Sequence, residues 1–371
     1  MKKKTLGIRG AYGESNFGDD ALMFFLYKWA EENQLEAFFI GKENNYIKYY
    51  IPNDYYISKE KSYRYFFNVL IFGGGTQFFS FEKKIEANSK LKILFKDPIY
   101  FFKKVLMTLE KRFLTKEKNY NFLFSIGIGL GPFVSNSKIE NTAKLKIKSM
   151  HGLFVRDDFS FNFAKKQNKE TFMATDICFL PEIIDFKPYK KTTNKIKKIG
   201  VILRDWKYSN EGQKYLNRII EEAKHLTDNN YKLDFILFKE EVDCESKLTN
   251  LNYNVIKWNP NNQTLEGFIK ILSGYDLFIS ARFHGVIFGA LLNIPSIAIE
   301  IEPKLKITKE LLGRGVRVWE QPFNKNLLEI IEGFDYKQAK QTLNSAVKKH
   351  NFLAQNMFDE LLKMIENKKA G

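Results

Sequence analysis

The sequence predicts an α/β protein made of two Rossmann-like domains that face each other across a cleft. Short apolar runs typical of buried parallel strands alternate with helical segments along the chain, which is the pattern of βαβ units with right-handed crossovers. A polar stretch poor in apolar residues, at positions 186–198, divides this pattern into two halves. The length of 371 residues and a hydrophobic content of 44% are sufficient for two cores.

The expected elements fall into one set for each half. The periodicity of apolar residues and the local composition predict strands in the first half at residues 5–9, 37–40, 69–72, 122–126, 152–155 and 171–174, with helices such as 21–32 between them. They predict second-half strands at 198–203, 232–238, near Val255, 275–279 and 296–299, and helices at 213–227, 265–273 and 286–292. The tail, 336–365, reads as a helix that can pack back across the cleft. We therefore expect an N-terminal domain at 1–187, a linker at 188–198 and a C-terminal domain at 199–371.

The net charge of +16 predicts attraction to anionic partners without specifying which ones. Basic residues concentrate at 83–118, where eleven Lys and Arg face four Asp and Glu among many apolar side chains. We interpret residues 82–118 as a basic helical insertion. Packing on its own domain is the simpler reading, and peripheral contact with anionic lipid headgroups is the alternative. No nucleic-acid recognition module accompanies the charge, so we expect no nucleic acid partner.

The cysteines and the N-terminal sequence predict where in the cell the protein is located. The cysteine pattern is typical of a reducing compartment. Cys178 and Cys244 lie in separate halves without metal-ligand spacing, so we expect neither a disulfide scaffold nor a metal site. The apolar run after Met1 is too short for a signal peptide, and no run of about 20 apolar residues could span a membrane. We therefore expect a cytoplasmic protein, either free or associated with the inner face of the membrane.

The segment 279–304, I-S-A-R-F-H-G-V-I-F-G-A-L-L-N-I-P-S-I-A-I-E-I-E-P-K, is the most informative part of the chain. It arranges Arg282, His284 and Lys304 around a strand, helix, strand unit, and ligands of open α/β sheets bind at the carboxyl ends of the strands. An arginine fork suits a carboxylate or phosphate, and an imidazole can carry a proton near neutral pH. These cations could instead cap backbone groups or pair with Asp276. The apolar flanks favour an anionic small molecule as the counter-ion, because unpaired buried charge is costly.

Several other turns place polar or flexible residues at strand ends. The first βα turn carries Asp19 and Asp20 at a helix start, where carboxylates either cap the helix or act on a hydroxyl. Arg156 and Asp176 also follow strands and could equally form local ion pairs. Glycines at 73–75 and 127–131 predict sharp turns or a close approach of a ligand, but the second run departs from the dinucleotide fingerprint.

Taken together, these motifs resemble the polysaccharide pyruvyl transferase family. The motifs occur in the family's order: N-F-G-D-D-A at 16–21, F-G-G-G-T at 72–76, G-I-G-L-G-P at 127–132, V-R-D-D-F-S at 155–160, A-T-D at 174–176, R-F-H-G at 282–285 and P-K at 303–304. The resemblance covers residues 5–305. It implies a glycosyltransferase-B-like fold and transfer of the three-carbon unit of phosphoenolpyruvate onto two sugar hydroxyls as a cyclic ketal, with release of phosphate. Arg9 and Glu302 depart from the family pattern, which leaves the acceptor in doubt more than the donor.

The resemblance also implies roles for individual residues. The donor would bind Arg204, Arg282, His284 and Lys304, and the catalytic groups would be His284 with Asp19 or Asp20. Neither a cofactor nor a metal is implied, and the acceptor would be a saccharide, either lipid-linked or polymeric. The expected acceptor or loop positions are Asn16, Gly18, Gly73, Gly74, Gly75, Gly129, Arg156 and Asp176.

Two rival functions fit part of the same sequence. A nucleotide-sugar glycosyltransferase would use the same cations for a diphosphate and a carboxylate such as Glu300 or Glu302 for the ribose. A basic protein that binds membrane surfaces or polyanions without catalysis would keep the charge but not need Arg282, His284 and Lys304. The intact cationic motif favours the transferase.

Overall fold

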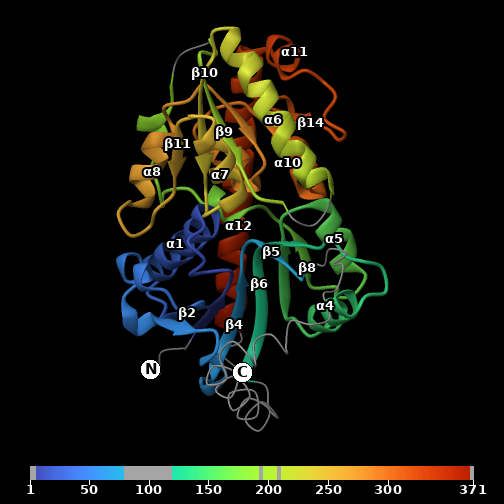
Figure 1. Cartoon of the computed structure of the whole chain (residues 1–371). Coiled ribbons are helices and arrows are strands. Elements are labelled where there is room, and N and C mark those ends of the chain that lie inside the picture. Colours follow the sequence, from blue (N-terminus) through green and yellow to red (C-terminus); the bar gives the residue numbers. More distant parts are fainter. Residues whose placement is uncertain (1–5, 79–118, 192–194, 207–209, 368–371) are drawn as a thin grey trace, which may run out of the picture.

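The structure, a computed structural model, describes residues 6–78, 119–191, 195–206 and 210–367 (Figure 1). The predicted α/β class with two parallel sheets is confirmed, one sheet lying in each half of the chain. The predicted insertion at 82–118 falls outside the described residues. None of the described helices is both long enough and apolar enough to span a membrane.

The N-terminal sheet has the strand order β3-β2-β1-β4-β6-β7-β8, with β5 paired to β6, and its paired strands are parallel. Helices pack against it, and Asn16, Ser137 and Asp157 cap α1, α4 and α5 with their side chains. The strands are β1 (Leu6–Arg9), β2 (Ala37–Gly41), β3 (Tyr56–Ser58), β4 (Phe67–Gly73), β5 (Thr76–Gln77), β6 (Tyr120–Leu130), β7 (Gly152–Val155) and β8 (Thr171–Met173). The α-helices are α1 (Phe17–Glu32), α4 (Lys138–Lys148) and α5 (Asp158–Lys165).

The C-terminal sheet has the order β11-β10-β9-β12-β13-β14 and is also parallel. Its central strands include fully buried runs such as L-F-I-S and S-I-A-I, typical of strands covered on both faces. The strands are β9 (Lys198–Leu203), β10 (Lys232–Leu237), β11 (Val255–Lys257), β12 (Leu277–Ser280), β13 (Ser296–Ile299) and β14 (Val316–Trp319). The helices are α6 (Asn210–Asp228), α7 (Val242–Asn250), α8 (Leu265–Leu272), α9 (Phe283–Leu291), α10 (Pro303–Leu312), α11 (Leu327–Glu332) and α12 (Tyr336–Asn367).

The structure corrects several predicted boundaries. β6 does not end before the glycines but runs through them, because the positive φ of Gly127 (+59°) forms an irregularity between Ser125 and Ile128 that the strand absorbs. Helix α1 begins at Phe17 rather than at residue 21, and α9 begins at Phe283 rather than at 286. Strand β9 spans Lys198–Leu203, as predicted, so Lys198 belongs to this strand and not to the linker. Strands β3, β5 and β14 were not predicted.

The two sheets are joined by a buried aromatic contact around Phe17, the first residue of α1. The Phe17 ring lies 4.7 to 5.4 Å, centroid to centroid, from four aromatic rings of the C-terminal half. Its backbone N–H also donates to the carbonyl of Phe238 at 2.8 Å. Aromatic pairs at these distances stabilise a contact beyond their buried area, so the start of α1 is fixed against the second sheet. The four partner rings are Phe238, Trp258, Phe268 and Phe288.

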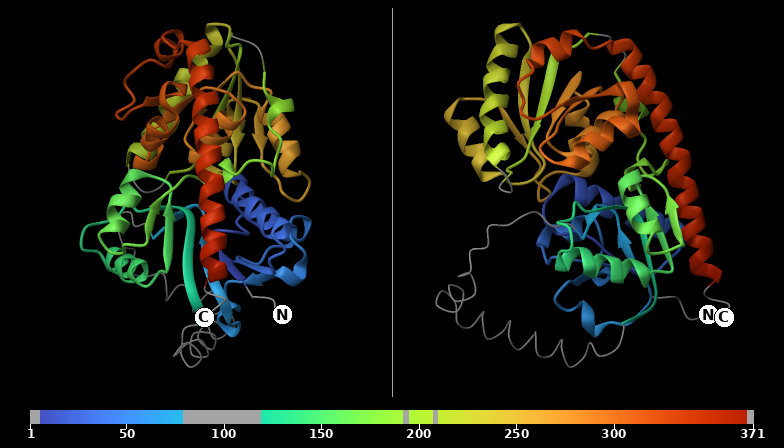
Figure 2. Two further views of the ribbon diagram at one scale, coloured as in Figure 1. Left: turned by 180° about the vertical axis from the view of Figure 1, so that it is seen from behind. Right: turned by 90° about the vertical axis from the view of Figure 1, so that its right-hand side faces the viewer.

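The C-terminal helix α12 packs along both halves of the molecule (Figure 2). Its His350 contacts one residue from each half, with Nδ1 2.8 Å from Thr175 Oγ1 and Nε2 3.0 Å from the carbonyl oxygen of Leu311. A carbonyl can only accept, so Nε2 carries the proton and Nδ1 accepts from the hydroxyl. Farther along, Phe358 packs against Trp29 of α1 with ring centroids 5.0 Å apart. The tail is helical, as the sequence predicted, and it packs back onto the N-terminal half.

Candidate functional site

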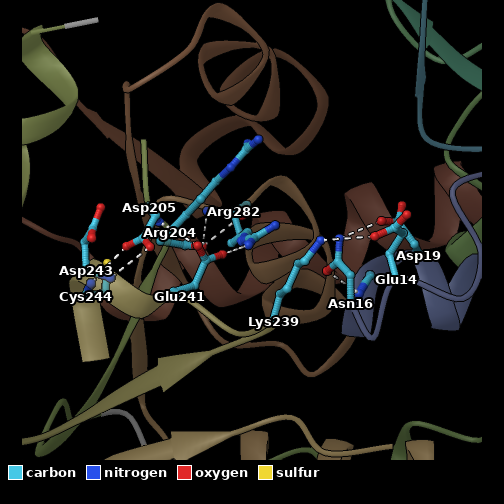
Figure 3. Close-up of polar contacts among 12 residues, drawn as sticks. Glu14, Asn16, Asp19, Arg204, Asp205, Lys239, Glu241, Asp243, Cys244 and Arg282 are labelled. Atoms are coloured by element: carbon cyan, nitrogen blue, oxygen red, sulfur yellow. Dashed lines mark hydrogen bonds and ion pairs between the residues drawn. The ribbon is translucent and has the colours of Figure 1, made fainter. Parts of the chain in front are cut away.

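The candidate site is a cavity of about 180 Å³ between the carboxyl ends of the two sheets, the place where open α/β sheets bind ligands. Figure 3 shows Arg204 and Arg282 reaching it from the C-terminal half, while Asn16 and Asp19 face them from the start of α1. Four of its lining side chains are cationic, and Asp19 is the sole carboxylate among the described lining residues. The cavity is lined by Ala11, Asn16, Asp19, Gly75, Thr76, Gln77, Arg156, Arg204, Phe238, Arg282, Phe283, His284 and Lys304.

Arg204 and Lys304 share one buried carboxylate, that of Glu302. Glu302 Oε1 lies 2.5 Å from the Arg204 guanidinium and 3.0 Å from Lys304 Nζ. Burial alone would raise the pKa of Glu302, but Lys304, Arg204 and Arg282 outweigh it and hold that pKa below its usual value. Burial lowers the pKa of Lys304, and Glu302 opposes this change. One anion is thus shared between two cations that both face the cavity.

Arg282 is the N-cap residue of α9 and pairs with Glu241. Only 12% of its side chain is exposed, and its Nε has no hydrogen-bond partner. Burial, followed by the repulsion of Arg204, lowers the pKa of Arg282 to about 10, so the side chain remains charged at neutral pH. Glu241 is also held by the backbone N–H of Asp205 at 2.8 Å. The carboxylate therefore has a fixed position behind the guanidinium.

Arg156, Asp176 and His284 form a closely packed polar group at the boundary between the halves. Asp176, fully buried, accepts from Arg156 Nη1 at 2.7 Å and lies 3.6 Å from His284 Nε2. Burial alone would raise the pKa of Asp176, but His284 and Arg156 outweigh it and hold the pKa well below its usual range. The Arg156 guanidinium lies 4.0 Å above the Phe283 ring. Asp176 therefore fixes both neighbours from behind the cavity wall.

His284 is held on its other side by the backbone of Gly18. A Cβ atom built on Gly18 would lie 2.3 Å from His284 Nδ1, closer than any real contact. Gly18 has ordinary helical geometry as the second residue of α1, so the glycine is required by the neighbouring ring and not by its φ angle. The imidazole is thus positioned between the Asp176 carboxylate and the start of α1.

The two consecutive acids of the first turn have different environments. Asp19 lines the cavity and accepts from the side-chain amide of Asn16 at 2.6 Å. Asp20 is fully buried on another side of α1, accepting from Tyr46 Oη at 2.6 Å and Trp258 Nε1 at 2.8 Å. Burial raises the pKa of Asp20 to about 7. The sequence offered both as catalytic candidates, but Asp20 lies outside the cavity and joins the two halves, which leaves Asp19 as the candidate.

The predicted glycines serve close packing more than ligand contact. Gly75 lines the cavity, whereas Gly73 and Gly74 lie beside it, and Tyr12 Oη donates to the carbonyl of Gly73 at 2.8 Å. A Cβ on Gly129 would lie 3.1 Å from Arg156 Nε. Gly129 therefore leaves room for the guanidinium.

Asp176, Cys178 and His284 have potential metal-ligand atoms within 4.8 Å of one another. The arrangement fits an ion-pair group better than a metal centre. Asp176 already accepts a hydrogen bond from Arg156. Burial, followed by the charge of Asp176, raises the pKa of the Cys178 thiol well above its usual value, which disfavours the thiolate that a metal ligand requires.

Sequence reasoning missed three features of this site. Glu241 carried no signal, because it lies 41 residues from Arg282 in the chain. Glu302 was seen only as a family departure or a ribose ligand, and its pairing with Arg204 spans 98 residues. Arg156 was assigned to the acceptor loops, but it lines the same cavity as the other cations.

Comparisons with known proteins agree with this geometry. The family model for polysaccharide pyruvyl transferases matches residues 16–303, and no protein with a curated description matches the sequence. The chain is similar in structure to a putative UDP-N-acetylglucosamine 2-epimerase from Listeria monocytogenes, with a TM-score of 0.59, 10% identity and coverage of 99% of this chain and 98% of that one. It is also similar to a glycosyltransferase from Rickettsia africae, with a TM-score of 0.54, 13% identity and coverage of 99% of each chain.

A third similar structure is HepE of Anabaena in complex with UDP and glucose, with a TM-score of 0.57, 10% identity and coverage of 98% of this chain and 100% of that one. At such identities these structures show the fold alone, which is of the glycosyltransferase-B type. The family match covers most of the chain and includes the start of α1 and the Arg282 to Pro303 segment that form the cavity. The chain therefore belongs to the polysaccharide pyruvyl transferase family and is a transferase.

Proposed function

We propose that this protein transfers the three-carbon unit of phosphoenolpyruvate onto two hydroxyls of a saccharide, forming a pyruvate ketal and releasing phosphate. The observation that carries the proposal is the convergence of Arg156, Arg204, Arg282 and Lys304 on one small cavity, with His284 and Asp19 in its wall. Phosphoenolpyruvate has a carboxylate and a phosphate on three carbons, so it needs several cations within a few ångströms.

The charge arrangement supports binding of such an anion. The carboxylates that balance the cations, those of Asp176, Glu241 and Glu302, are not among the lining residues and lie behind them. A ligand therefore meets the cationic ends directly. One charge pair 4 Å apart contributes roughly 4 kcal/mol at an effective dielectric constant near 20, before desolvation. Several such pairs are needed to offset the loss of water from a trianionic ligand.

The reaction can be written with this chain's own groups. His284, as an imidazolium, gives its proton to the methylene carbon C3, which becomes a methyl group, and positive charge develops at C2. A first sugar hydroxyl adds to C2 and loses its proton to Asp19. The C2–O bond to phosphate then breaks, phosphate departs with that electron pair, and a second hydroxyl closes the ketal at C2. Asp19 passes its proton to the departing phosphate, and the proton of the second hydroxyl restores His284, so protons balance and both side chains return to their starting states. General acids and bases of this kind typically contribute about 10² to 10⁴ in rate.

The size of the cationic cavity suits a donor as small as phosphoenolpyruvate, and the carboxylates near it have other partners. A cavity of about 180 Å³ is smaller than the roughly 300 to 1,000 Å³ usual for drug-sized ligands. The carboxylates offered for a ribose are also engaged, since Glu302 pairs with Arg204 and Lys304 while Glu300 lies 3.5 Å from Lys306. We further propose that the acceptor, whether lipid-linked or polymeric, is modified in the cytoplasm.

The test is a thermal-shift titration of wild type and Arg282→Gln with phosphoenolpyruvate, pyruvate, phosphate and a panel of nucleotide sugars. A ligand at about 100 times its Kd stabilises the fold by about 2.7 kcal/mol. Arg314→Gln, which removes an exposed arginine that is not among the lining residues of the cavity, is the matched control. We expect phosphoenolpyruvate to stabilise wild type and the control but not Arg282→Gln. Stabilisation by a nucleotide sugar alone would instead show a glycosyltransferase.

A further inference from the structure

A second and larger cavity, of about 720 Å³, lies beside the first in the N-terminal half. The two cavities share Ala11, Thr76 and Gln77 in their linings, so a ligand in one borders a ligand in the other. The volume is within the range of about 300 to 1,000 Å³ that holds ligands the size of a mono- or disaccharide. Its lining comes from the carboxyl ends of β1 and β4, the residue after β3, β5 with the residue after it, the first residue of β6, and α4 with its C-cap: Arg9, Gly10, Ala11, Lys59, Phe72, Thr76, Gln77, Phe78, Tyr120, Thr142, Leu145, Lys146 and Ser149.

The cationic side chains of this second cavity lack the carboxylate partners that those of the first cavity have. Arg9, Lys59 and Lys146 line it and no carboxylate is among its described lining residues. Ion pairs within the described part of the chain involve none of these three cations. In the first cavity, by contrast, every arginine and lysine has a carboxylate behind it.

Arg9 is the strongest indicator of an anionic ligand. It ends β1 and is only partly exposed, and burial lowers its pKa without an opposing carboxylate. Lys146 approaches from α4 and donates to Tyr120 Oη at 2.7 Å, with its Nζ 4.9 Å from the centre of that ring. A partly buried guanidinium with no counter-ion is costly, and a phosphate would satisfy its fork with two hydrogen bonds.

The remaining wall suits the less polar faces of a sugar. Phe72, Phe78 and Tyr120 supply aromatic surface, and Thr76, Gln77 and Ser149 supply hydroxyl and amide groups. Apolar walls with a few placed polar groups are the usual composition of small-molecule sites. Thr76 and Gln77, which belong to both cavities, would lie at the junction where the acceptor hydroxyls meet the donor.

We propose that this second cavity binds the acceptor, and that the acceptor is a saccharide carrying a phosphate group held by Arg9, Lys59 and Lys146. The proposal rests on the proposed function, since it takes the first cavity as the donor site. The phosphate is either that of a soluble sugar phosphate or that of a saccharide linked to a lipid through a diphosphate. Both sources present the same phosphate chemistry to the three cations.

The test compares matched probes by calorimetry: hexose and N-acetylhexosamine 1-phosphates against the same sugars without phosphate. The variants are Arg9→Gln with Lys146→Gln in the second cavity, and Arg282→Gln in the first. Lys148→Gln, an exposed lysine on the same helix that lines neither cavity, is the control for a lost charge.

We expect at least one sugar 1-phosphate to bind at least tenfold more tightly than its free sugar. The double variant should lose that tenfold, while Lys148→Gln and Arg282→Gln retain it. The double variant should also bind phosphoenolpyruvate within twofold of wild type, which shows that it is folded. Equal binding of sugar and sugar phosphate, no sugar phosphate binding at all, or unchanged binding by the double variant would overturn the proposal.

Two further measurements test the source of the phosphate and the identity of the donor separately. The sugar that binds best is repeated on a short prenyl diphosphate, and tighter binding than that of the 1-phosphate identifies the lipid-linked source. If wild type fails to bind phosphoenolpyruvate while sugar phosphate binding still depends on Arg9 and Lys146, the proposed donor falls and the phosphate-binding cavity stands.

Discussion

Replacing Gly18 by alanine tests whether the position of His284 controls the reaction. The new Cβ would lie 2.3 Å from His284 Nδ1, and 2.7 Å and 3.0 Å from its Cγ and Cβ atoms. Heavy atoms in contact are separated by about 3.5 Å or more, so the imidazole has to move by about 1 Å. The helix itself is not weakened by the change, because Gly18 has a helical φ angle and alanine is the better helix former. The substitution therefore displaces one side chain without an intrinsic penalty to α1.

A misplacement of about 1 Å at a reacting group can lower the rate by about 10²-fold. We expect Gly18→Ala to lower kcat by that factor, measured as phosphate released from phosphoenolpyruvate with the acceptor identified by the titrations above. Binding of phosphoenolpyruvate should change much less, because the cations that hold it do not touch Gly18. The chain has 4 histidines, so the ring of His284 can be followed by NMR as an independent measure of its displacement.

The matched control is Gly267→Ala, which adds the same methyl group to an exposed position of α8. It should leave kcat within twofold of wild type. If Gly18→Ala also retains its kcat while the His284 resonances show a displaced ring, the imidazole is not part of the chemistry and the proton donor must be sought elsewhere. An unmoved ring would show that the contact with α1 relaxes in another way.

Three other substitutions test separate parts of the site. Asp20→Asn should remove a pH dependence of stability. Burial raises the pKa of Asp20 in the folded protein to about 7, above its unfolded value, so the wild type loses stability as the pH rises from about 4 to about 7. The variant should therefore have a higher Tm than wild type at pH 8 and lose that advantage at pH 4. Glu302→Gln removes the anion shared by Arg204 and Lys304 and should lower the free energy of unfolding by about 3 kcal/mol. In chemical denaturation, millimolar phosphate should restore part of that free energy. An unchanged free energy of unfolding would mean that the two cations are well solvated. Asp19→Asn should lower kcat by about 10² to 10⁴ with the Kd for phosphoenolpyruvate unchanged, and an unchanged kcat would remove Asp19 as the base.

The sequence predicted the parts of the site that depend on local pattern. Arg282, His284 and Lys304 were found because a strand, a helix and a second strand follow one another there, and parallel strands bring their carboxyl ends to one edge. The fold class followed from the same alternation. The edge strands β3 and β14 were missed because their sequences, Y-I-S and V-R-V-W, lack the continuous apolar run by which the central strands were recognised.

What escaped prediction depends on pairings between distant segments. Successive residues of a helix point about 100° apart, so Asp19 and Asp20 cannot both face the cavity, and only the packing of α1 shows which one does. Glu241 and Glu302 meet their cations from other strand ends, and no local motif records such a pair. The 82–118 interpretation, with its membrane alternative, stays a prediction.

The placement of Phe17 and α12 has a consequence for how the chain melts. One continuous set of buried apolar side chains extends from Leu6 through Phe17 and Phe238 to Ile365, so neither half can lose its structure without exposing apolar surface of the other. Proteins of two domains often unfold in separate steps. Here we expect one cooperative transition in calorimetry, with equal calorimetric and van't Hoff enthalpies. A ligand bound between the two sheets should therefore raise the temperature of this single transition, in which both halves unfold together.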